Sequence, residues 1–173
     1  MALPIAASIT TILLNIQAQL MSLTGLGEEA VHIVSKREIR FQADKEIYIM
    51  PGAPVRDSIV SDGSARFALL IRRPITVIIG ARCILDTIND GTVALTDSTQ
   101  GVGLLTTEEQ VLQLTDTVLV DVSNNALLWE DIRFVGGGEP PTQDMTDEAS
   151  YGYNYSVLVF EVAYTPILTS PVP

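Results

Sequence analysis

The apolar positions near the start of the chain repeat with a helical spacing. They fall at intervals of 4, 3, 1, 3, 4 and 3 residues, at Ile5, Ile9, Ile12, Leu13, Ile16, Leu20 and Leu23. Such intervals place the apolar side chains on one face of an α-helix. Pro4 suits the first turn of that helix, and Gly25 and Gly27 follow its last apolar position. The pattern predicts an amphipathic helix over about 5–24 that packs on a sheet.

Residues 1–27 carry no charged side chain, which raises the question of export or membrane insertion. A signal peptide has a positively charged region before its apolar stretch, and this stretch has none. Polar residues such as Thr10, Asn15 and Gln19 interrupt the run, which disfavours a membrane-spanning helix. We therefore expect no association with a membrane.

Short β-prone segments follow the predicted helix. The first three are Val31–Ser35, Ile39–Phe41 and Glu46–Met50, and the last of them stops at Pro51. Residues 51–54 and 58–64 have the composition of a loop or a hairpin, with Asp62-Gly63 at a turn. This part of the chain therefore predicts strands joined by tight connections.

Two nearly continuous apolar runs, Phe67–Arg72 and Ile75–Arg82, occupy the middle of the chain. Continuous apolar runs are typical of central strands that are covered on both faces. Arg73-Pro74 separates the two runs and predicts a bend or the end of a strand. Residues 86–103 contain Asp90-Gly91 and two further glycines, which predicts a loop.

A second helix is predicted in the second half of the chain. Thr106-Thr-Glu-Glu109 matches a capping box, which predicts a helix over about 107–124. Its inward face would consist of Val111, Leu114, Val118 and Val122. Residues 118–122 are β-branched enough that a strand there is the alternative.

The remaining segments alternate between strands and polar connections. Trp129–Val135 predicts a strand, and Gly136–Gly138 predicts a flexible connection. The polar stretch up to Ala149 predicts an exposed loop, and Tyr153–Thr165 has the longest strand pattern in the chain. The order of elements predicts an α+β fold, with a mostly antiparallel sheet, two amphipathic helices packed on one face and extended loops. We expect a single domain over 1–165 and a Pro-rich C-terminal arm over 166–173.

Charge is distributed unevenly along the 173 residues, whose net charge is −11. The first 100 residues hold ten acids and nine bases, all nine of them between residues 36 and 82. The remainder holds 11 acids and a single base, Arg133. Such an acidic chain is a poor general binder of nucleic acid. It has either an ordinary solvated surface or one acidic face that stacks on a partner of opposite sign.

Residues with the chemistry of an active site are scarce. Cys83 and His32 are the single cysteine and histidine, so an internal disulfide or a cysteine-based metal cluster is excluded. A catalytic Cys–His pair would require these two side chains to meet in space. Residues 86–97 depart from a calcium loop because Ile88 stands at a ligand position. We expect a non-enzymatic protein without cofactor or metal, and a small ligand-binding domain or an enzyme acting through two carboxylates is the alternative.

The element order resembles that of tail terminator proteins of long-tailed bacteriophages. The residues that carry this resemblance are the N-terminal helix, Arg72–Arg82, Asp86, the helix entry Leu104–Glu109, and the strands Leu127–Val135 and Tyr155–Tyr164. The resemblance covers about residues 5–165. Residues 37–64 and the C-terminal arm depart from it, which leaves open a neighbouring neck or tail-completion role.

The resemblance implies a hexameric ring that caps the tail tube and joins it to the head connector. Such a virion protein would be assembled in the host cytoplasm. Its partners would be further copies of itself, the tail-tube protein, connector or neck proteins, and the sheath protein if the tail is contractile. DNA would pass through the lumen only transiently.

A stacking ring needs charged contacts on its faces. The candidate contact residues are Arg72, Arg73, Arg82, Asp86, Glu139, Asp144, Asp147 and Glu148. Each of them is otherwise a solvated charge or a member of a local ion pair. Acidic residues of the segment 139–148 in a lumen would also repel the phosphates of passing DNA.

Overall fold

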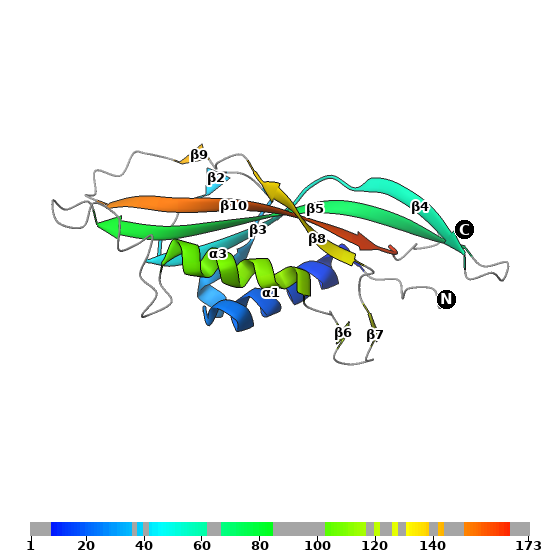
Figure 1. The fold of residues 1–173 in the computed structure, drawn as a ribbon, viewed down its shortest axis with the longest axis horizontal. Helices are drawn as coiled ribbons and strands as arrows, with labels where there is room; N and C mark the ends of the chain where they lie inside the picture. Colours follow the sequence, from blue (N-terminus) through cyan, green and yellow to red (C-terminus); the bar gives the residue numbers. More distant parts are fainter. Residues whose placement is uncertain are drawn as a thin grey trace, which may run out of the picture.

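The fold is an open β-sheet with helices packed on one of its faces (Figure 1). The computed structural model describes residues 8–35, 38–39, 42–61, 67–84, 103–116, 120–121, 126–127, 131–138, 142–143 and 151–166. The architecture confirms the predicted α+β class, with a mostly antiparallel sheet and two helices.

The main sheet has six strands, five of them in the order β1-β3-β5-β10-β8. The bounds of these five are Val31–Ile33 (β1), Lys45–Pro51 (β3), Phe67–Ile84 (β5), Tyr151–Tyr164 (β10) and Asp131–Gly137 (β8). The sixth strand, β4 (Val55–Ser61), pairs with the first part of β5. The pairing of β1 with β3 is parallel, and the other pairings in this sheet are antiparallel.

Strands β3 and β4 lie end to end along the same side of β5 and form one long hairpin with it. Pro51 is opposite Ile75 and Val55 is opposite Arg72, so the β3–β4 junction holds one residue more than the facing part of β5. This extra residue makes the junction a β-bulge. A second register shift follows between Arg56 and Ser58. Of the two alternatives predicted for this region, a loop or a hairpin, β4 and β5 pair as a hairpin, and the predicted turn at Asp62-Gly63 lies outside the described residues.

Pro74 does not end a strand, so of the two alternatives predicted from Arg73-Pro74, a bend or the end of a strand, the second is wrong. Strand β5 runs through it without a break for 18 residues. The Pro74 carbonyl accepts a hydrogen bond from the Gly52 amide at 2.8 Å, so this edge of Pro74 faces the bulge. A proline in a central strand is tolerated where the ladder is already interrupted, because no N–H is needed there.

Helix α1 spans Ile9–Thr24 and has the predicted apolar face. Its buried side chains are Ile12, Leu13, Ile16 and Leu20. The hydroxyl of Ser8 accepts a hydrogen bond from the Thr11 amide, which caps the first turn. Gly25 ends the helix with φ of 66°, a left-handed conformation that glycine adopts without strain. The predicted start at residues 5–8 moves to Ile9, and residues 1–7 lie outside the described part of the chain.

The second helix begins earlier and ends earlier than predicted. Helix α3 spans Leu104–Leu112 and continues as a 3₁₀ turn, η2, over Gln113–Asp116. Its N-cap is Gly103, which supplies no side-chain bond, so the predicted capping box is wrong. Thr107 instead donates its hydroxyl to the Gly103 carbonyl at 3.0 Å. Because Val120–Asp121 forms the strand β6, the strand alternative for residues 118–122 holds in the part that is described.

The glycine run at the end of β8, Gly136–Gly138, is not the flexible connection that was predicted. Gly136 and Gly137 belong to β8, and the Gly138 amide donates to the Val157 carbonyl at 2.9 Å. Val159 faces Gly136 and Phe160 faces Phe134, so one extra residue on β8 lies between them. Gly136 absorbs this bulge with φ of 149°, which other residues rarely adopt.

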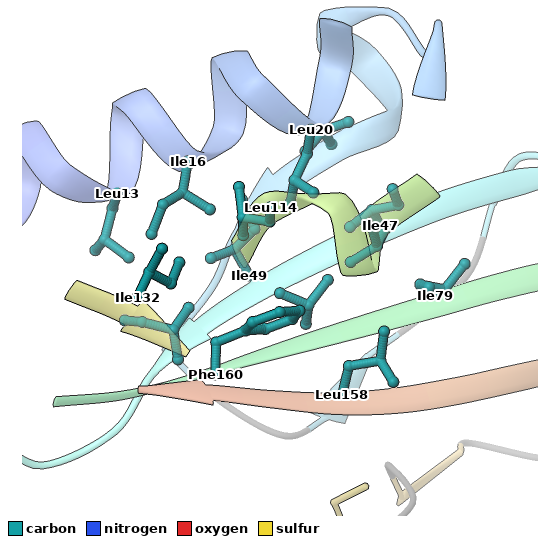
Figure 2. Close-up of a cluster of buried hydrophobic side chains, with 14 of the residues drawn as sticks. Leu13, Ile16, Leu20, Ile47, Ile49, Ile79, Leu114, Ile132, Leu158 and Phe160 are labelled. Carbon is teal, nitrogen blue, oxygen red and sulfur yellow. The ribbon is translucent and has the colours of Figure 1, made fainter. Parts of the chain in front are cut away.

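One continuous apolar core fills the space between the helices and the sheet (Figure 2). Ile16 and Leu20 of α1 point toward the sheet, and Phe160 of β10 lies fully buried beneath them. Leu114 of η2 and Val111 of α3 complete this layer, as their predicted inward positions require. Each fully buried side chain of this size contributes about 1.5–3 kcal/mol through removal from water, so this layer is the main source of stability.

The remaining described elements are short. The strands β2 (Glu38–Ile39) and β9 (Thr142–Gln143) pair in parallel, and β6 pairs antiparallel with β7 (Ala126–Leu127). A single 3₁₀ turn, η1 (Glu28–Ala30), leads into β1. Strand β10 confirms the predicted long C-terminal strand, and residues 167–173 of the predicted arm lie outside the described part of the chain.

Candidate interaction surface

Arg72 and Arg73 are neighbours on β5 but point to opposite faces of the sheet. Successive residues of a strand alternate between its two faces. Ile71, Ile75 and Val77 belong to the core under the helices, so Arg73 shares their face, which we call the helix side. Arg72 points to the other face, which we call the open side.

A row of four charged side chains crosses the open side of the sheet. The Arg72 Nε lies 3.0 Å from Asp57 Oδ1, and its Nη1 lies 3.3 Å from Glu161 Oε1. Glu161 Oε1 also accepts from Arg133, whose Nη2 is 2.6 Å away. These residues come from β4, β5, β10 and β8. The row therefore joins four strands through two arginines and two carboxylates, and we call it the charged row.

The charged row neutralises Arg72 within the chain. The side-chain hydrogen bond to Asp57 raises the pKa of the Arg72 guanidinium above its ordinary value, partial burial lowers it, and the charges of Asp57 and Glu161 raise it further. Of the two sequence interpretations of Arg72, the local ion pair is the one that the structure shows. A charge compensated at this distance attracts a partner less than an uncompensated one does.

Arg73 has a different environment on the helix side. The residue is half-buried, and its Nε atom is buried without a hydrogen-bond partner within the described residues. The residue opposite Arg73 on β10 is Val162, and the residue opposite Val162 on β8 is Ile132. Both Val162 and Ile132 are apolar core residues. A buried donor without a partner costs about 1–3 kcal/mol, so an acceptor at this position would stabilise the structure.

The other candidate contact residues fall mainly outside the described part of the chain. Arg82 lies on β5 opposite Tyr153, but its side chain is not described. Asp86, Glu139, Asp144, Asp147 and Glu148 all lie outside the described residues. The structure thus places Arg72 and Arg73 on opposite faces of the sheet, and the predicted acids lie outside the residues that it describes.

The open side has a second polar cluster at the other end of the sheet. Glu46 of β3 is buried, and its Oε2 accepts hydrogen bonds from the Gln42 amide at 2.8 Å and from the Tyr48 hydroxyl at 3.0 Å. The His32 ring lies 4.9 Å from the Tyr48 ring, and its Nε2 is 3.6 Å from Glu46 Oε1. A buried carboxylate held by two donors is a satisfied structural group.

Lys45, next to Glu46 on β3, is buried on the helix side. Its Nζ lies 3.0 Å from the hydroxyl oxygen of Thr107 on α3, so it ties this helix to the sheet. Burial lowers the pKa of the Lys45 ammonium below its ordinary value. The pair Lys45 and Glu46 resembles the pair Arg73 and Arg72. In each pair, two adjacent charged residues of one strand lie on opposite faces of the sheet, the first on the helix side and the second on the open side.

The backbone separates His32 from Cys83. His32 faces Tyr48, which faces Ile78, and Cys83 is five residues further along β5. Five residues of a strand span about 16 Å, which is too far for a nucleophile–base hydrogen bond.

Within the described residues, His, Cys, Asp and Glu side chains form no group of three or more that could hold a metal ion. No helix of the described residues is long and apolar enough to cross a membrane.

Sequence reasoning missed most of the charged row. Asp57, Glu161 and Arg133 are distant in sequence, and only the pairing of β4, β5, β10 and β8 brings them together. The alternation of Glu161 with apolar neighbours was a signal that this residue lies on the less apolar side of β10.

No protein-family model and no curated protein matches this chain.

Proposed function

We propose that this protein is a non-enzymatic structural subunit that forms a ring, hexameric as in the tail terminators it resembles. The ring would end the tail tube of a long-tailed bacteriophage and join it to the head connector. The proposal rests on the resemblance in element order and on the shape of the central sheet.

The observation that carries the proposal is the length of the central strands relative to the helical layer. The 18 residues of β5 span about 60 Å, whereas the 16 residues of α1 span about 24 Å. Strands of globular proteins are usually 3–10 residues long. The β4–β5 hairpin extends past the helices at one end, and β5 and β10 extend past them at the other (Figure 1). Ribbons of this length reach toward neighbouring subunits.

The β8 edge of the sheet supports the same proposal. Within the described residues, β1 and β8 are the two ends of the strand order. On β8, Phe134 and Val135 are 43% and 59% exposed. Exposed apolar side chains on an edge strand are a liability in a monomer and are suited to burial in an assembly. The charged row would keep the projecting hairpin at a fixed angle to the sheet.

The mass of the full chain in solution and its appearance in negative stain test this proposal. We expect rings of about six copies, formed by the chain alone or after addition of polymerised tail-tube protein encoded by the same genome. A chain that stays a compact monomer under both conditions would contradict the proposal. Rings that bind a connector protein but not the tail tube would instead assign the chain to the neck.

A further inference from the structure

Two arginines share the helix side of the sheet where the hairpin leaves the helical layer. Arg56 of β4 is directly opposite Ile71 of β5, and directly opposite residues of an antiparallel pair point to the same face. Ile71 packs against the core on the helix side, and Arg73 is the next residue of β5 on that face. Arg56 and Arg73 are therefore diagonal neighbours, with Cα atoms about 7–8 Å apart.

The surroundings of this arginine pair are apolar within the described strands. On the helix side, the neighbours of Arg73 are Ile71 and Ile75 along β5, and Val162 and Tyr164 on β10. The described carboxylates nearby, Asp57 and Glu161, are on the open side in contact with Arg72. Helix α1 has no charged residue over its whole length. The two sides of the same segment thus differ in charge, one neutralised and one basic.

The arginine pair is accessible. Arg56 is exposed, and so are Ala53 and Pro54 of the β3–β4 bulge beside Arg73. Arg73 itself is half-buried. A guanidinium presents its N–H groups as a planar fork that matches the two oxygens of a carboxylate. The Nε of Arg73 is itself buried and has no hydrogen-bond partner within the described residues, so the exposed side of the pair is Arg56.

Charge complementarity identifies the occupant. Residues 101–173 of this chain hold 11 acids against one base, so a second copy offers abundant carboxylates. A phosphate backbone has the same sign, but a chain of net charge −11 repels nucleic acid as a whole. The head-to-tail contact of a ring joins different surfaces of identical subunits, as a basic patch on one copy and an acidic surface on the next require.

We propose that Arg56 and Arg73 form a docking site for carboxylates of a second copy of this chain. The site deepens the proposed ring function, on which it rests, by naming one side of the contact between subunits. Arg72 does not take part, because the charged row occupies it on the opposite face.

Sedimentation velocity of the full chain over a concentration series tests this docking site. The variants are Arg73→Gln, Arg56→Gln and both together, with Arg73→Lys to keep the charge without the planar fork. Glu29→Gln is the control, because it changes one exposed charge on η1, away from the arginine pair and from the charged row. Each single glutamine variant is expected to weaken self-association about tenfold and the double variant further, while the control keeps the affinity of the parent chain. Raising the salt concentration should weaken the parent chain and leave the double variant nearly unaffected.

The outcomes separate this inference from the proposed function. Rings that form equally well in the parent chain and in the double variant would overturn the docking site and leave the ring function standing. A parent chain that forms no ring, alone or on tail tubes, would contradict both. Binding of a short DNA duplex that the double variant loses, with self-association unchanged, would show that phosphate is the partner and would overturn the proposal. Equal urea unfolding midpoints for Arg56→Gln and the parent chain verify that the variant is folded.

Discussion

The two sides of the central sheet differ in how they are stabilised. The helix side is covered by α1, α3 and η2 and buries large aliphatic side chains around Phe160. Among the described residues, the open side has a small apolar cluster of Ile39, Tyr48, Ile78 and Val157, with the Glu46 site at one end and the charged row at the other. Burial dominates on one side, and paired polar groups cover the other.

Because the two sides differ in this way, neighbouring residues of one strand are not interchangeable. Because side chains alternate between faces, a shift of one position moves a group from a water-excluded layer to a surface network. Arg72 and Arg73 carry the same charge, yet Arg72 is compensated within the chain, whereas the buried Nε of Arg73 has no partner among the described residues. Four predictions test how strict this division is.

The largest effect is expected from truncating an aromatic residue on each side of β10. Phe160→Ala removes a fully buried ring from the helix side and should lower the free energy of unfolding by about 3–5 kcal/mol. Tyr155→Ala removes a 37% exposed ring from the open side and should cost less than half as much. Urea denaturation of both variants measures the two changes. Equal losses would show that the open side contributes as much burial as the helix side.

A second test adds a methyl group where β8 leaves the sheet. The Cβ of Gly138→Ala would lie 2.6 Å from Val157 Cγ1 and 3.1 Å from Val159 Cγ2 on the open side. Such overpacking should lower the free energy of unfolding by about 1–3 kcal/mol. In the control Gly137→Ala, the nearest atom is the Val157 carbonyl oxygen at 3.6 Å, an ordinary contact. A smaller loss for Gly138→Ala than for Gly137→Ala would contradict tight packing at this point.

The third test compares the two adjacent arginines. Arg72→Gln breaks contacts with Asp57 and Glu161 and should lower the free energy of unfolding by about 1 kcal/mol or less, because the charged row is partly exposed. The loss should shrink in high salt. Arg73→Gln removes the buried Nε, which has no hydrogen-bond partner within the described residues, and should not lower the free energy of unfolding. Thermal or urea unfolding at low and high salt measures both. The comparison would fail if Arg73→Gln had the larger, salt-dependent cost.

The smallest effect is a pH dependence from the buried Lys45. Burial lowers its pKa in the folded state below the ordinary 10.5, so the folded protein releases this proton at a lower pH than the unfolded chain. The cost of burying the charge is therefore complete below the folded-state pKa and disappears as pH rises to 10.5. The stability of the parent chain relative to Lys45→Met should rise over this range. Unfolding titrations from neutral pH to pH 10.5 measure the difference, and a constant difference would refute the prediction.

Local patterns in the sequence predicted those elements whose packing follows from a simple periodicity. The apolar face of α1 and the long strand β10 are examples, since each has one strong period over many residues. Two errors came from reading local signals without their neighbours. Pro74 appeared to end a strand, and Thr106 appeared to cap a helix, but the β3–β4 bulge accommodates the first and α3 begins at Leu104 instead.

The candidate contact residues also show what local sequence patterns can and cannot predict. The concentration of basic residues between positions 36 and 82 is visible in the sequence, and Arg72, Arg73 and Arg82 belong to it. Which of these charges is compensated depends on Asp57 and Glu161, which lie 15 and 89 positions away from Arg72. No local pattern contains that pairing.

The sequence by itself determined the α+β class, the buried face of the first helix and the uneven charge, because each depends on residue order or composition alone. The tertiary structure decided the continuity of β5 through Pro74, the assembly of the charged row and the separation of Arg72 from Arg73. These features depend on strand register, which is set by contacts between segments far apart in the chain. A shift of β5 by one residue in its pairing with the neighbouring strands would exchange Arg72 and Arg73 between the open side and the helix side.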